Sequence, residues 1–211
     1  MAKFDRRGNP ISFSGQQAID ALDHAFDLLH AYQADPLAEV DRIIADHPDF
    51  AMAHAFRAGA LATATDKAFE PELARSVEAA EALAARANDR ERTHIAAVRA
   101  WLDGDWERAT ELWGRASIAY PRDLLALQYA HVGDFFLGYS HMLRDRVARV
   151  LPHWNRDLPG YGFVKGMYAF GLEEAGDYAQ AEAHGREAVA LNSQDGWAVH
   201  AVTHVMEMQG R

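Results

Sequence analysis

Two glycines constrain the fold of this chain most strongly, because each begins the same short pattern. Gly104-Asp105-Trp106 and Gly176-Asp177-Tyr178 lie 72 residues apart, and 72 residues also separate Ala109 from Ala181. A pattern that returns at a fixed interval indicates repeated structural units that stack on one another. Two units of about 36 residues fit the interval, which is long enough for a pair of helices and their turns.

Helical periodicity fills the sequence between these glycines. Apolar residues recur at three- and four-residue spacing, and alternation typical of strands is missing, so we expect no strands. Prolines interrupt the helical stretches at Asp35-Pro36, His47-Pro48, Tyr120-Pro121 and Leu158-Pro159-Gly160. The spacing predicts an all-α, tetratricopeptide-like (TPR-like) α-hairpin solenoid, a right-handed superhelix of about five hairpins that forms one domain over residues 1–211.

The expected hairpins can be placed along the chain. Ala109 and Ala116 are small enough for two antiparallel helices to approach closely, and Trp113 and Tyr120 would fill the space between neighbouring hairpins. The middle unit matches less well, because Gly138 interrupts it where its helices should join. The predicted hairpins cover 16–46, 50–87, 93–121, 123–151 and 164–193.

The last segment predicts a further helix over 197–208, which Asp195-Gly196 can cap. Gly210 follows Gly176 by 34 residues, so it falls where the next turn between helices belongs. We therefore expect the domain to be truncated at its C-terminus. Missing C-terminal repeats or a second chain would then cover the last helix.

Composition narrows the function classes. The net charge of −10 and the lack of a basic patch argue against nucleic acid and against a membrane surface as partners. The chain has no cysteine, which excludes disulfides and thiol catalysis and fits a cytoplasmic protein. The first ten residues lack the apolar core of a secretory signal, and no window is long and apolar enough to span a bilayer.

Three polar residues of the last predicted helix stand out. His200, His204 and Glu207 follow an i, i+4, i+7 spacing, which places them on one helical face. Two histidines at this spacing can share a metal ion with a carboxylate, although the pattern is not His-Glu-x-x-His. A stripe that faces a ligand and an ordinary polar surface remain the alternatives, and we assign no metal ligand.

The first helix of each hairpin is expected to line the concave face of such a stack. By this register His131 and Asp134, three residues apart, are able to touch, and the acidic pair Glu173-Glu174 could serve acid–base work. No phosphate-binding loop or dinucleotide fingerprint is visible, so we predict no cofactor and assign no catalytic residue. The predicted ligand-binding residues are His94, Trp101, His131, Asp134, Phe170, Glu173, Trp197, His200, His204 and Glu207.

Several stretches together resemble the tetratricopeptide repeat protein 38 family, also called StaR-like. They are residues 169–178, the histidine-rich tail 195–211, the segment 5–10, and Gly104-Asp105-Trp106. The resemblance covers nearly the whole chain and corresponds to the N-terminal part of the family, whose members are about twice this length. It implies an α-helical fold of degenerate TPR units, and it transfers no catalytic residue.

Two functions therefore remain open. The first is a binding module that holds a peptide or a small ligand in its concave groove, as repeat solenoids commonly do. The alternative is an enzyme or metalloprotein with a polar site centred on histidine and glutamate inside the superhelix.

Overall fold

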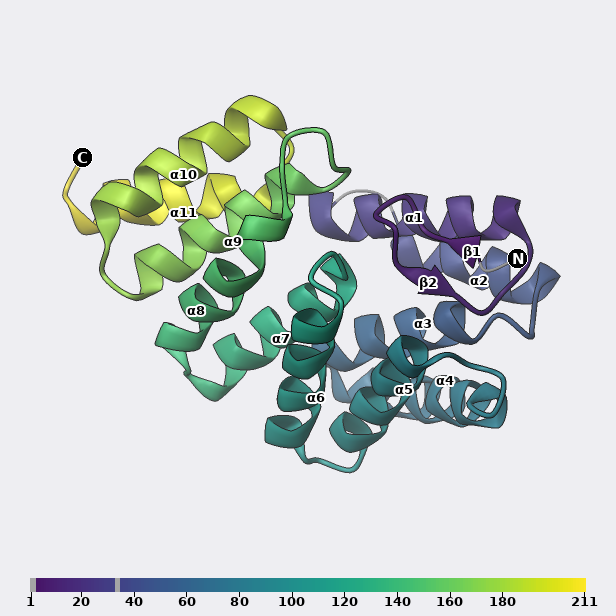
Figure 1. Cartoon of the computed structure of the whole chain (residues 1–211). Coiled ribbons are helices and arrows are strands. Elements are labelled where there is room, and N and C mark those ends of the chain that lie inside the picture. Colours follow the sequence, from purple (N-terminus) through teal and green to yellow (C-terminus); the bar gives the residue numbers. More distant parts are fainter. Residues whose placement is uncertain (1–2, 33–34) are drawn as a thin grey trace.

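Antiparallel helices that are neighbours in sequence are also neighbours in space, as Figure 1 shows. The computed structural model describes residues 3–32 and 35–211; Met1 and Ala2, part of the stretch inspected for a secretory signal, lie outside it. The helices are α1 (Gln16–Ala31), α2 (Pro36–Asp46), α3 (Ala51–Thr63), α4 (Glu70–Leu83), α5 (Asp89–Leu102), α6 (Trp106–Ala119), α7 (Leu124–Leu137), α8 (Ser140–Val150), α9 (Tyr161–Glu174), α10 (Tyr178–Leu191) and α11 (Gly196–Met208). Short 3-10 turns, η1 (Lys67–Phe69) and η2 (Leu151–His153), precede α4 and follow α8.

The helices form five hairpins, α1–α2, α3–α4, α5–α6, α7–α8 and α9–α10, and α11 packs against both α9 and α10. The predicted all-α helical repeat solenoid is confirmed. Ala109, Ala116, Ala181 and Ala188 are buried where the helices meet, as their 72-residue correspondence indicated. No helix within the described ranges is long and apolar enough to cross a bilayer.

Four glycines end helices in the same way. Gly104, Gly138, Gly176 and Gly210 have φ of +85°, +74°, +81° and +67°. Each glycine N–H bonds to the carbonyl three residues back, and the next N–H bonds to the carbonyl five residues back. This left-handed cap satisfies the last helical carbonyls, and glycine adopts it without a steric penalty. Gly138 therefore terminates α7 at a joint, rather than interrupting the middle hairpin.

The expectation that the chain has no strands is wrong in one place. β1 (Lys3–Phe4) and β2 (Pro10–Ile11) pair antiparallel, with Lys3 opposite Ile11 and Phe4 opposite Pro10. Two residues are too few for an alternating pattern to be visible in the sequence. This small hairpin lies beside α1, α2 and α3 in Figure 1, and the Asn88 side-chain amide donates to the carbonyl of Pro10 at 3.0 Å.

The beginning of the solenoid meets a segment far along the chain. Nε of Arg7 donates to the Pro159 carbonyl at 3.2 Å, and the rings of His30 and Phe163 lie 5.1 Å apart. Figure 1 shows the loop before α9 against the end of α1. The stack is thus curved enough that α1 reaches the last helices, and this contact closes one side of the site described below.

One close approach between helices gives a test of the packing. A Cβ on Gly171 of α9 would lie 2.5 Å from the backbone carbonyl of Leu143 in α8. Backbone cannot rotate away as a side chain can, so we expect Gly171→Ala to destabilise the fold by about 1–3 kcal/mol. Urea unfolding measures this change.

Gly162, at the start of α9, is the matched control for this prediction. A Cβ there would meet its nearest neighbour at 3.7 Å, an ordinary contact. Gly162→Ala should be neutral or stabilising by up to about 1 kcal/mol, because alanine favours the helix. Equal effects of the two substitutions would contradict the close approach of α8 and α9.

Candidate functional site

A pocket of about 340 Å³ opens where the ends of α1, α7, α9 and α11 approach one another. We call it the central groove. Its volume is in the range of pockets that hold small molecules or single side chains of a peptide. The residues that line it are Tyr32, Phe135, Phe170, Gly196, Trp197 and His200.

The central groove continues at both ends. An apolar extension of about 350 Å³ runs toward α3 and shares Tyr32, Phe135 and Trp197 with it. A polar extension of about 570 Å³ lies along α11 and shares Gly196 and His200. The helices that contribute to these pockets are α1, α3, α7 and α9, which are first helices of their hairpins, and α11, which follows the fifth hairpin. The face that we expected to be concave therefore contains the groove.

Aromatic rings pack edge to face around the groove. The Trp197 ring lies 4.9 Å from Phe170 and 5.2 Å from His131, the latter at 86°. Phe170 also lies 5.9 Å from Phe135 and 5.4 Å from His200. Such tilted contacts between rings hold each side chain in a defined orientation. The groove wall on the α9 and α11 side is thus a continuous cluster of aromatic contacts.

His131 lies beneath these rings and is fully buried. Burial, with a smaller contribution from the nearby Arg146, lowers the pKa of His131 to about 3. Neither ring nitrogen reaches hydrogen-bond geometry with a described residue, although the Leu143 backbone is close enough to favour the protonated ring. At neutral pH His131 is an uncharged packing residue of the groove, because its pKa lies far below 7.

Tyr32 forms the opposite wall of the groove and packs directly on Gly196, where a larger residue would not fit. Tyr32 caps α1 in the left-handed conformation, with φ of +52°, and a Cβ on Gly196 would lie 2.6 Å from its ring. Beneath Gly196 the carboxylate of Asp195 accepts the N–H of Ala198 and caps α11. Burial raises the pKa of Asp195 to about 6. The Tyr32 side chain is 65% exposed, and its phenol is protonated at neutral pH and can donate a hydrogen bond.

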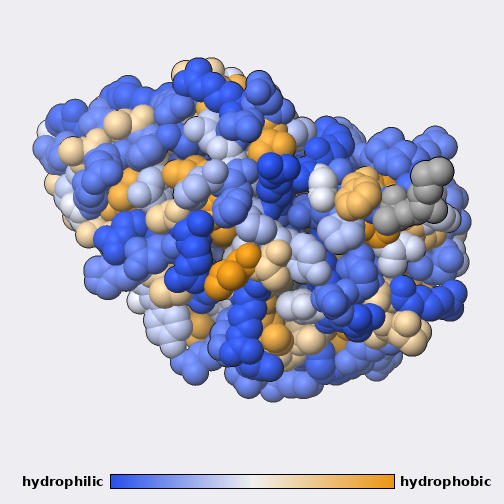
Figure 2. All heavy atoms as spheres, in the orientation of Figure 1, coloured by the Kyte–Doolittle hydropathy of each residue, from blue (hydrophilic) through white to orange (hydrophobic). Residues whose placement is uncertain are grey.

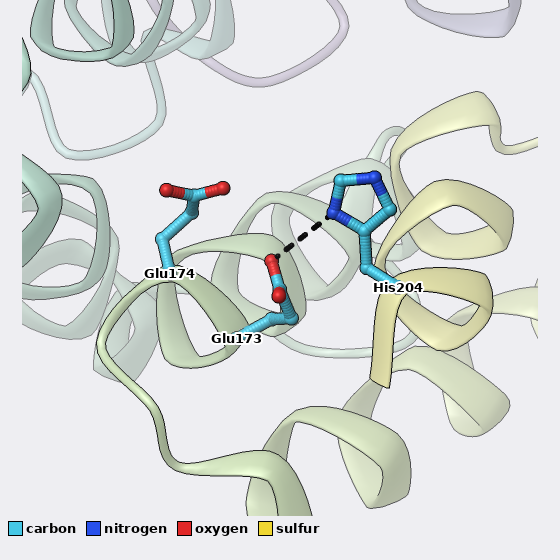
Figure 3. Close-up of side chains that lie close together, drawn as sticks. All are labelled: Glu173, Glu174 and His204. Carbon is cyan, nitrogen blue, oxygen red and sulfur yellow. Dashed lines mark ion pairs between the residues drawn. The ribbon is translucent and has the colours of Figure 1, made fainter. Parts of the chain in front are cut away.

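Histidines and carboxylates gather at the polar end of the groove. The rings of His200 and His204 are 4.1 Å apart, and Nδ1 of His204 lies 3.5 Å from Oε2 of Glu173. Burial and the adjacent Glu174 raise the pKa of Glu173, while burial and His204 lower the pKa of His200. Figure 3 shows Glu173 and Glu174 at the end of α9, facing His204 on α11.

Seven of the ten predicted ligand-binding residues come together at the groove or its extensions. Phe170, Trp197 and His200 line the central groove, and His131 packs beneath it. His204 and Glu207 line the polar extension, and Glu173 contacts His204. The register of first helices thus located these residues on one face.

Three predicted residues lie elsewhere. His94 is buried, with Nε2 2.9 Å from the Asp123 carboxylate, and Trp101 stacks on Trp106 with 4.7 Å between ring centres. Asp134 does not touch His131 through its carboxylate; it is buried and forms an ion pair with Arg146 of α8. None of the three lines the groove. His94 contacts the start of the next hairpin, whereas Trp101 and Asp134 contact the second helix of their own hairpins.

Two aromatic residues of the groove were missed by sequence reasoning. Tyr32 ends α1, and only the curvature of the whole stack brings it beside α11. Phe135 is 47% exposed beside Phe136, so the pair of aromatic residues near a helix end was a signal that could have indicated the groove.

A comparison of the chain with models of known protein families finds no match.

Proposed function

We propose that this protein binds a peptide or a small ligand in the central groove. The observation that supports the proposal most directly is the convergence of four aromatic residues, from four helices, around one pocket that opens to solvent. Phe170 and Trp197 are buried, whereas Tyr32 and Phe135 are 65% and 47% exposed. Exposed aromatic side chains beside a pocket are typical of a surface that a partner or ligand covers. Figure 2 shows that the face of the molecule in view is mostly hydrophilic, with apolar residues scattered over it.

The groove chemistry favours a particular kind of ligand. Tyr32, Phe135 and Trp197 offer ring faces and edges to an apolar or aromatic group. His200 stands at the polar end and can exchange a hydrogen bond with the ligand. Since Glu173 and Glu174 lie beside this end and the chain carries a net charge of −10, a neutral or cationic ligand fits better than an anion.

A neutral fluorescent probe, N-phenyl-1-naphthylamine, tests the groove without knowledge of the natural ligand. We expect saturable binding to the wild-type protein and about tenfold weaker binding to Phe135→Ala. Truncation of an aromatic contact residue at a binding centre costs about 1–2 kcal/mol, which corresponds to this change in affinity. Because Phe135 is half exposed, its truncation should leave the fold nearly as stable as before.

Ile118→Ala is the matched control, because Ile118 is a 51% exposed apolar residue of α6 that does not line the groove. Its probe affinity should equal that of the wild type. Equal affinity of Phe135→Ala and wild type, or an equal loss in both variants, would place the bound probe outside the groove and refute the proposal.

Two finer assignments accompany this proposal. Repeat spacing and the shared glycine joints support TPR-like units, and the resemblance noted above supports membership of the tetratricopeptide repeat protein 38 family. The lack of cysteine supports a cytoplasmic location.

A further inference from the structure

Two carboxylates and one imidazole converge at the polar end of the central groove. Glu173 and Glu174 end α9, and His204 lies on the third turn of α11, so that one ligand atom from each is within 4.8 Å of the others. In a tetrahedral zinc site, ligand atoms lie about 3.3 Å apart, given bonds of about 2.0–2.2 Å. Small rotations of these side chains would close the remaining difference.

The Glu173 carboxylate is buried and has one oxygen atom without a hydrogen-bond donor among the described residues. Glu173 is 7% exposed, and its Oε2 accepts no hydrogen bond from the residues that the structure describes. This oxygen faces His204 in Figure 3, at a distance of 3.5 Å that is long for a hydrogen bond. A buried carboxylate oxygen without a partner is costly, and a bound cation would remove that cost.

The charges around the cluster also favour a bound cation. The groups that act on Glu173 are the like-charged Glu174 and the imidazole of His204, with no arginine or lysine of the described chain among them. Two other buried carboxylates have arginine partners, since Asp134 pairs with Arg146 and Asp23 with Arg7. The two glutamates at the end of α9 therefore present uncompensated negative charge beside a histidine.

The polar extension gives an ion and its water access to the cluster. Its volume of about 570 Å³ is lined by His200, His204 and Glu207. His200 lies one turn before His204 with the rings 4.1 Å apart, so it is near enough to become a fourth ligand or to orient a bound water. A site with three protein ligands and an open position is typical of catalytic rather than structural zinc.

We propose that Glu173, Glu174 and His204 bind one divalent first-row transition-metal ion at the polar end of the central groove. One nitrogen and two carboxylate donors suit Zn²⁺, Co²⁺, Mn²⁺ or Fe²⁺, whereas Ca²⁺ requires six to eight oxygen ligands. The ion would lie next to His200, where it could contact the polar group of a ligand whose apolar part occupies the groove. The metal site does not depend on the proposed ligand binding, since its donors lie outside the central groove.

Titration of the untagged, metal-free full chain with Zn²⁺ by isothermal calorimetry tests the site. We expect one ion per chain with a Kd below about 10 µM, and at least tenfold weaker binding by Glu173→Gln and by His204→Ala. Co²⁺ should give the visible absorption of a protein-bound ion in the wild type and lose it in both variants.

One control variant separates ligation from general attraction. His141→Ala removes an exposed histidine of α8 that lies outside the cluster of proposed ligands. It should keep the wild-type stoichiometry and affinity within about threefold. A Zn²⁺ affinity that falls equally in His141→Ala, or that stays unchanged in Glu173→Gln, would overturn the proposed site.

A stability measurement keeps the test valid if a variant folds poorly. At a free Zn²⁺ concentration of about 100 times Kd, binding should raise the free energy of unfolding by about 2.7 kcal/mol, the equivalent of a 100-fold shift in the folding equilibrium. The wild type should show this increase and Glu173→Gln should not; an increase in both would refute the site. Unchanged binding of the naphthylamine probe by Glu173→Gln would show that loss of the metal and loss of the groove are separate events.

Discussion

Replacing Arg7 by methionine is expected to destabilise the protein by about 3–5 kcal/mol. Arg7 and Asp23 are each only 1% exposed, and Nη1 of Arg7 lies 2.7 Å from Oδ1 of Asp23. Removal of one partner from a buried ion pair leaves the other charge without compensation, which is among the costliest single substitutions. The guanidinium also lies 5.5 Å above the Phe26 ring, so the substitution loses a cation–π contact as well.

Urea unfolding of three variants checks this prediction. Arg6→Met is the neighbouring control. The Arg6 side chain is 41% exposed, pairs with Asp27 at the surface and lies 3.6 Å from Asp23. Because Arg7 still compensates Asp23 in this variant, the loss of Arg6 should cost less than about 1 kcal/mol. The double variant Arg7→Met/Asp23→Leu should recover most of the stability. Burial raises the pKa of Asp23 in spite of the adjacent Arg7, which indicates that desolvation outweighs the attraction within the pair.

The contact made by Arg7 also bears on the groove. Through the Pro159 carbonyl, Arg7 connects the N-terminal hairpin to the segment before α9, and the same closure holds Tyr32 against Gly196. Arg7→Met should therefore weaken binding of the naphthylamine probe even under conditions where the variant is fully folded. A double variant that stays as unstable as Arg7→Met would contradict the ion-pair explanation.

The hairpins could be predicted from sequence because their determinants are local. Glycine is the residue that most readily adopts the left-handed conformation at the end of a helix. Gly104 and Gly176 therefore mark two helix ends in the sequence itself. Capping residues such as Asn88 and Asp123 lie next to the helices that they start. Such features need no knowledge of distant contacts.

The groove could be predicted only in part. The register of first helices placed Phe170, Trp197 and His200 on one face, since helical geometry fixes which residues share a side. It failed for His94 and Asp134, whose partners Asp123 and Arg146 come from neighbouring helices that no local rule identifies.

The positions of Tyr32 and Arg7 could not be predicted from the sequence. The position of Tyr32 beside Gly196 depends on the curvature of the whole stack, which is the sum of small rotations between successive hairpins. The same curvature brings Arg7 to Pro159, more than 150 residues away in the chain. Sequence periodicity specifies the repeats, but it does not specify the angle at which they stack.

Mild acid is expected to destabilise the protein through two buried histidines. Burial lowers the pKa of His30 to about 4 and that of His131 to about 3, whereas both would titrate near 6.5 in the unfolded chain. Below pH 6.5 the unfolded chain therefore binds more protons at these sites than the folded one. Each histidine should then lower the free energy of unfolding by about 1.4 kcal/mol per pH unit as the pH falls from 6.5 to 4.

Other charged groups also contribute to the pH dependence. Arg146 faces His131, and both Arg7 and Asp27 face His30; these groups are included in the pKa values of the two histidines. Asp195 opposes the effect, because its pKa of about 6 in the folded state lets the folded chain bind a proton that the unfolded chain binds only near pH 4. Asp195 thus offsets roughly one of the two histidines. The raised pKa values of Asp23, Asp134 and Glu173 act in the same direction as Asp195, whereas the lowered pKa of His200 adds to the loss of stability.

The contribution of His131 can be isolated with His131→Leu, which removes the titrating group and keeps a similar volume. The stability of this variant relative to wild type should improve by about 3 kcal/mol between pH 6.5 and pH 4, whatever its value at neutral pH. His141→Leu, at an exposed position, should run parallel to the wild type over the same range. Urea midpoints of the wild type and both variants, measured at half-unit intervals of pH, test this prediction. Parallel curves for His131→Leu and wild type would mean that His131 is protonated or solvated in the folded state, because only an unchanged proton affinity leaves the slope unaltered.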